Sequence, residues 1–170
     1  MKKILLTITL LTLVGCSQNE ASSPEETVEK TIPETIEEVT KTPEELELEQ
    51  RFPDDLAEND MLNAIHYMAH QKVAAEVKWG HEQITQAKIE HLLAIAKNEA
   101  TTYAHKDLYV TTLESWAAGD FSNAVDVHNK IWEMQGGDEA TNSGKATRLL
   151  TAEEEEAYVN NNLEFDLYEE

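Results

Sequence analysis

Apolar residues at helical spacing, three or four positions apart, dominate this chain between about residue 60 and residue 160. No stretch of this region alternates apolar and polar residues as a half-buried strand would. Its length suits one modest domain with a single core. We therefore predict an all-α fold, a small compact bundle of about four to five helices.

End signals place these helices along the chain. Thr85 and Thr151 can cap two of them, because a threonine hydroxyl accepts a hydrogen bond from the first turn, and Glu154 completes a capping box with Thr151. Glycines follow the other three and act as terminators. The predicted helices cover about 60–77, a stretch after Thr85, about 104–118, about 121–135, and a short stretch after Thr151.

The segment before this domain has a different composition. Residues 17–60 contain 15 acids, three bases and all four prolines of the chain. Such a segment buries too little apolar surface to fold, and its like charges extend it. We expect a disordered acidic tether over 16–59, a helical domain over 60–160 and an acidic tail over 161–170. The alternative, in which this segment packs on the domain as a strand or helix, remains open.

The chain opens with MKKILLTITLLTLVGC. Two lysines precede an apolar run from Ile4 to Val14, which is too short to span a hydrocarbon core of roughly 30 Å. This pattern is typical of an export signal, here residues 1–15, and it resembles a bacterial lipoprotein signal with Cys16 as the lipidated residue. Cys16 is the only cysteine, so a disulfide within the chain is impossible. We expect attachment to the outer face of the cytoplasmic membrane through lipid at Cys16.

The negative net charge of the chain limits the classes of molecule that it can bind. The net charge is −21, and removal of residues 1–15 would take away two lysines and no acid, lowering it to −23. Such a chain repels phosphate groups, so nucleic-acid binding is not expected. The sequence favours an extracytoplasmic protein or another envelope component as the partner.

Two histidines four residues apart, His66 and His70, lie on the first predicted helix. Zinc proteases use this spacing with a glutamate directly after the first histidine, but Tyr67 occupies that position here. The pair could still supply two metal ligands. Histidines on a half-exposed helix edge are the simpler interpretation, and we assign no metal and no cofactor from the sequence. The residues considered for completing a ligand set are His81, His91, His105 or a carboxylate.

Polar residues interrupt the apolar faces at two further places. Lys72 continues the apolar stripe of the first helix, where it could pair with Glu76 or a neighbouring helix, or bind an anionic group. His128 and Asn129 share a helix face with Trp132 and must be hydrogen-bonded or line a pocket. We expect them to approach His70 or Lys72, in a structural hydrogen bond or in a ligand pocket.

Three stretches of the domain carry a resemblance. They are MAHQKVAAEVKWG (68–80), DFSNAVDVHNKIWEMQGG (120–137) and GKATRLLTAEEEEAYV (144–159). Together they resemble a family of small Gram-positive lipoproteins classed as a domain of unknown function. The resemblance implies no activity or substrate. It implies only that Lys72, Trp79, Gly80, His128, Asn129, Trp132 and the double glycine at 136–137 belong to recurring motifs.

These observations favour a non-catalytic lipoprotein whose helical domain binds a protein, a peptide or an envelope component. The alternative is an envelope enzyme or metal-binding protein built on a His/Lys/Asn cluster. No nucleophile motif accompanies His128, so we assign no catalytic residue. The candidate binding residues are His70, Lys72, Trp79, His128, Asn129 and Trp132.

Overall fold

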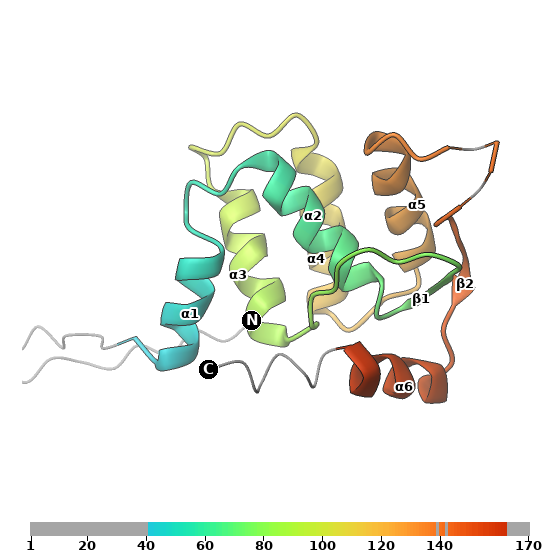
Figure 1. Cartoon of the computed structure of the whole chain (residues 1–170). Helices are drawn as coiled ribbons and strands as arrows, with labels where there is room; N and C mark the ends of the chain where they lie inside the picture. The colour runs from blue at the N-terminus through green and yellow to red at the C-terminus, as the bar shows by residue number, and fades with distance from the viewer. Residues whose placement is uncertain (1–40, 139, 142, 163–170) are drawn as a thin grey trace, which may run out of the picture. The chain divides into compact units, whose positions relative to one another are not determined.

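The computed structural model describes residues 41–138, 140–141 and 143–162 (Figure 1). This part of the chain is mostly helical, as predicted, but it also contains a two-stranded sheet that the sequence did not indicate. The expected signal peptide, Cys16, the expected tether up to residue 40 and residues 163–170 lie outside the described residues. The elements are α1 (Pro43–Arg51), α2 (Glu58–Ala69), β1 (Val73–Ala75), α3 (Gln86–Lys97), α4 (Lys106–Ala117), α5 (Ala124–Met134), β2 (Ala146–Leu149) and α6 (Ala152–Asn162).

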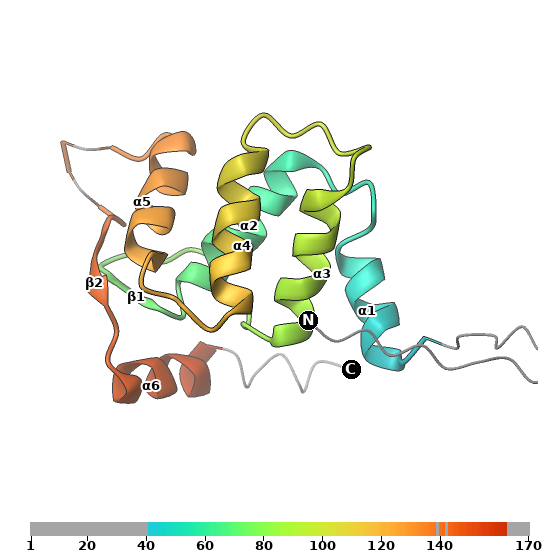
Figure 2. The same cartoon turned by 180° about the vertical axis from the view of Figure 1, so that it is seen from behind.

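The core lies between two pairs of helices. α3 packs along α4, and α2 packs against α5 while also contacting α4, as both views show (Figures 1 and 2). Trp116 and Tyr109 on α4 are completely buried and are the largest side chains of the core. Burial of such aromatic and aliphatic surface is the main stabilising contribution in a domain of this size. This packing fixes α2 and α5 face to face.

Capping confirms two of the predicted helix starts. The Thr85 hydroxyl accepts a hydrogen bond of 3.1 Å from the backbone N–H of Lys88 at the start of α3. Before α6, the Thr151 backbone N–H donates to the Glu154 carboxylate at 2.9 Å, and the Glu154 N–H donates to the Thr151 hydroxyl at 3.3 Å. Both caps satisfy backbone N–H groups that a helix start would otherwise leave without partners.

The first predicted helix is shorter than expected. α2 ends at Ala69, and the chain then turns into β1, which pairs antiparallel with β2 in the register Val73–Leu149 and Ala74–Arg148. These strands have only three and four residues, too few to show an alternating pattern in the sequence. The prediction of a helix to residue 77 is therefore wrong for its last two turns.

The folded domain also begins before residue 60. Residues 41–59, which we expected in the tether, contain α1 and two core residues, Phe52 and Leu56, with 5% and 7% of their surface exposed. The Thr42 side chain caps α1 in a capping box with Glu45. Residues 41–59 are thus part of the helical domain, so the alternative left open above holds for this part of the segment, whereas residues 17–40 lie outside the described residues. No helix in the described residues is long and apolar enough to cross a bilayer.

Candidate metal centre

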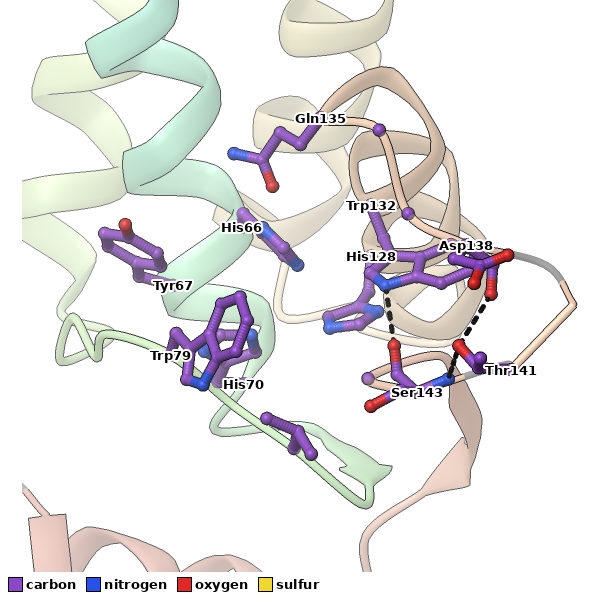
Figure 3. Close-up of a pocket in the computed structure, with 14 residues that line it drawn as sticks. His66, Tyr67, His70, Trp79, His128, Trp132, Gln135, Asp138, Thr141 and Ser143 are labelled. Atoms are coloured by element: carbon purple, nitrogen blue, oxygen red, sulfur yellow. Dashed lines mark hydrogen bonds between the residues drawn. The ribbon is translucent and has the colours of Figure 1, made fainter.

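Three histidines meet where α2 packs on α5. His66 and His70 lie one turn apart at the end of α2, and His128 faces them from α5 (Figure 3). Their ring centroids are 4.5 to 5.2 Å apart. One ring nitrogen from each residue lies within 4.8 Å of the others, and no carboxylate of the described residues joins this group. We call these three residues the histidine cluster.

The tautomer of His70 is set by the backbone. Its Nδ1 lies 2.8 Å from the carbonyl oxygen of Gly80. A carbonyl oxygen can only accept, so Nδ1 carries the hydrogen and Nε2 keeps its lone pair. This is the usual arrangement behind a metal-binding histidine, in which the second nitrogen donates to a carbonyl group.

Asn129 sets the tautomer of His128 in the same way. The Asn129 amide donates to the carbonyl oxygen of Ala146 at 2.9 Å and accepts from the Ala146 N–H at 2.8 Å, which fixes its orientation. Its oxygen Oδ1 lies 3.2 Å from His128 Nδ1, so that nitrogen is the donor. His128 Nε2 is then a free acceptor, and it is buried without a hydrogen-bond partner. Strand β2, through Ala146 and Asn129, thereby orients the His128 ring on α5.

His66 is the least satisfied member of the cluster. Only 7% of its surface is exposed, and neither ring nitrogen has a partner at hydrogen-bond geometry, while the nearby Gln135 side chain opposes the lowering of its pKa. Each buried polar atom left in this state costs about 1–3 kcal/mol. With His128 Nε2, three buried nitrogens are left without partners where two helices meet. A bound ligand that interacts with these three nitrogens would remove the cost of leaving them without partners.

The cluster is uncharged at neutral pH. Burial lowers the pKa of His66 to about 4, and the neighbouring His128 lowers it further. Burial also lowers the pKa of His70 to about 3 and reduces the pKa of His128. Neutral imidazole is the form that binds metal ions, so no proton has to leave before coordination.

The histidine cluster forms one wall of a pocket of about 480 Å³. Tyr67, Trp79 and Trp132 supply aromatic surface, and the loop after α5 supplies polar groups (Figure 3). The loop lies very close to Trp132: a Cβ atom at Gly137 would lie 2.2 Å from the indole ring. Trp132 also donates from Nε1 to the Ser143 carbonyl oxygen at 3.1 Å, which holds the indole in the wall.

Residues 65–160 match the model of a family of unknown function, DUF6241. The match covers more than half of the chain. The chain belongs to the DUF6241 family. The DUF6241 region runs from the second half of α2 through most of α6, so it contains the whole histidine cluster and its pocket. No curated protein and no solved structure matches the chain.

The structure brings most of the candidate residues of this DUF6241 domain together. His70 and His128 face each other, and Asn129 lies behind His128. Trp132 forms a buried wall of the pocket, whereas Trp79 lines it with 83% of its surface exposed.

Lys72 is the exception, because it neither lines the pocket nor forms a hydrogen bond with the histidine cluster. Its ammonium group pairs with the Glu155 carboxylate of α6 at 2.5 Å and lies 4.2 Å from the centroid of the Phe121 ring. It pairs with a neighbouring helix, one of the two structural roles considered from the sequence. Its partner is not Glu76.

His66 was not among the candidate binding residues, although its spacing to His70 was noted. The sequence did not show which residue is the third member of the cluster. None of His81, His91 and His105 completes the group; His128, which lies 58 positions beyond His70, does. The spacing of His66 and His70 together with a polar His128 on an apolar helix face was the signal available in the sequence.

Proposed function

We propose that this protein binds one divalent transition-metal ion, of the Zn²⁺ class, through His66, His70 and His128. The observation that carries the proposal is the convergence of three buried, uncharged imidazoles with three ring nitrogens that lack hydrogen-bond partners. Three histidines are a known zinc ligand set, and imidazole also suits copper, nickel and iron.

The distances in the cluster fit this use. Tetrahedral Zn²⁺ with Zn–N bonds of about 2.0–2.1 Å needs donor atoms separated by roughly 3.3 Å. The donor nitrogens already lie within 4.8 Å of one another. Small rotations about the side-chain torsions of the histidines can close the remaining gap. The hydrogen bonds from His70 to Gly80 and from His128 to Asn129 limit these rotations and leave the Nε2 atoms of both residues available to a metal ion.

We also propose that the metal-binding domain is held at the outer face of the bacterial cytoplasmic membrane by lipid at Cys16. The support is the sequence of residues 1–16, with its short apolar run and its single cysteine. A protein, peptide or envelope component was the ligand favoured by the sequence alone. The histidine cluster now favours a metal ion as the ligand of the domain.

Metal content tests the first part of the proposal. The full chain, purified in detergent without a histidine tag, is dialysed against Zn²⁺, and bound metal is measured by mass spectrometry. We expect about one ion per chain. His66→Gln, His70→Gln and His128→Gln should each lower the affinity at least tenfold, whereas the exposed His105→Gln should not. Retention of tight binding in all three cluster variants would refute the site.

Acylation tests the second part. Mass spectrometry of the protein recovered from bacterial membranes should find acyl chains on Cys16, and Cys16→Ser should release the protein into the medium. Membrane-bound wild-type protein without acyl chains on Cys16 would refute lipid anchoring without bearing on metal binding.

A further inference from the structure

We infer that the bound metal keeps one coordination position open to the pocket, and that this position takes the carboxylate of a small ligand whose flat apolar part stacks on Trp79. This inference rests on the metal site proposed above. It adds the class of ligand that the loaded site would bind.

The open position follows from the number and placement of the ligands. Three histidines form the group, and all three line the same pocket. A tetrahedral ion held by three protein ligands has a fourth position for water or an exogenous ligand, which distinguishes open from closed sites. The pocket measures about 480 Å³, within the range of small-molecule sites, so the fourth position has room for more than a water molecule.

Charge favours an anionic group at this position. Three neutral imidazoles leave the full double positive charge on the metal ion. Asp138 is the only acid among the described residues that line the pocket, and its carboxylate accepts a hydrogen bond of 2.9 Å from the backbone N–H of Ala140. One carboxylate does not neutralise the ion, so the loaded pocket attracts anions.

Trp79 supplies the second half of the recognition. With 83% of its surface exposed, it is by far the most exposed large apolar side chain among the described residues, and it lines the same pocket as His70 (Figure 3). Trp132 gives the contrast, since only 8% of its surface is exposed. An indole face left open next to a metal position suits a flat group attached to the donor carboxylate.

Cobalt spectroscopy on the full chain tests the inference. Co²⁺ replaces Zn²⁺ at histidine sites, and its visible absorption changes when the fourth ligand changes. Azide, acetate and benzoate are titrated into the Co²⁺-loaded protein as the probes. We expect all three to shift the spectrum, and benzoate to bind about three- to tenfold more tightly than acetate because only benzoate can stack.

Trp79→Ala should remove the preference for benzoate and leave the azide and acetate affinities unchanged. Leu149→Ala is the matched control, because Leu149 is also an exposed apolar residue but does not line the pocket, and it should retain the preference.

Each outcome has a separate meaning. If cobalt binds but none of the three anions changes its spectrum, the fourth position is closed and the inference is wrong while the metal site stands. If benzoate and acetate bind equally to the wild-type protein, the role of Trp79 is wrong. If no cobalt binds, the proposed function itself fails.

Discussion

The carbonyl oxygen of Gly80 lies 2.8 Å from Nδ1 of His70 and fixes the ring that faces the pocket. Only glycine fits this position. Its φ angle is +78°, and a Cβ atom there would lie 2.7 to 2.9 Å from the ring atoms of Tyr67. Gly80 therefore allows the chain after β1 to pass across Tyr67 and to place a hydrogen-bond acceptor behind a metal ligand.

Gly80→Ala should disturb both the backbone and the site. The positive φ costs about 1–2 kcal/mol for a residue with a Cβ atom, and the contact with Tyr67 adds to this cost. We expect a lower free energy of unfolding in urea and a metal affinity reduced about tenfold or more.

Gly119→Ala is a closely matched control. Gly119 has the same φ angle of +78°, but a Cβ atom there would have nothing within 4 Å. The Gly119→Ala variant should be less stable only because its φ angle is unfavourable for alanine, and it should bind Zn²⁺ with unchanged affinity. Equal metal affinities for the two alanine variants would show that the hydrogen bond from His70 to Gly80 does not orient the ligand.

His66→Leu should separate stability from binding. Both ring nitrogens of His66 are buried without a partner, and leucine fills a similar volume with no polar atom. The metal-free variant should be more stable than the wild-type protein by about 1–3 kcal/mol in urea unfolding, because an unsatisfied buried group is removed. Zn²⁺ should stabilise the wild-type protein and not the variant. A metal-free variant less stable than wild type would mean that His66 is satisfied within the fold.

Lys72 and Glu155 should support α6 and have no role in metal binding. α6 buries no side chain, and Glu155 joins it to the end of α2 through Lys72 and through the Gln71 amide at 2.9 Å. Lys72→Met should lower stability by about 1.5–3 kcal/mol, the usual loss for a hydrogen bond to a charged group. The Zn²⁺ affinity should remain that of the wild type. A large loss of affinity would place Lys72 in the site after all.

Local signals in the sequence predicted five of the six helices in the described residues, because each signal lies within the element that it describes, whereas α1 was assigned to the tether. Thr85 and the Thr151–Glu154 pair cap α3 and α6 as expected. The end of α2 was wrong because β1 depends on pairing with β2, whose residues are more than 70 positions away. A short strand of this kind is stabilised by its partner, and its own sequence carries little information.

The candidate site could be predicted only in part, because local patterns show which residues are unusual but not which of them meet in the fold. Polar residues on an apolar helix face, such as His128 and Asn129, indicate a hydrogen-bond network or a pocket without saying which. The spacing of His66 and His70 could not reveal that α5 supplies the third ligand. Lys72 was misleading as a binding candidate because its partner, Glu155, lies on a helix that follows 80 residues later. Tertiary contacts decided all three cases.

Stability of the metal-free protein should depend on pH through the histidine cluster. The folded-state pKa values of His66 and His70, about 4 and about 3, lie below the unfolded value of 6.5. Between these values the unfolded chain binds more protons than the folded one, so stability is complete above pH 6.5 and falls as the pH drops toward 4. Each of the two histidines should lower the free energy of unfolding by about 2 kcal/mol between pH 7 and pH 5.

Urea unfolding in the presence of a chelator at pH 7, 6 and 5 measures this effect. Carboxylates also contribute near pH 5, so the wild-type protein is compared with His66→Leu, which lacks one of the three imidazoles but keeps every acid. The variant should lose about 2 kcal/mol less than the wild type over this range. His66 and His70 face His128, Lys78, Tyr67 and the uncharged Gln135, and Lys78 donates to the His70 carbonyl oxygen at 2.7 Å. Burial lowers the pKa of Lys78 to about 8, so it is mostly protonated at pH 7 and below and contributes little to the change. An identical pH dependence in both proteins would mean that His66 is solvated and would remove the physical basis for an uncharged, metal-ready cluster.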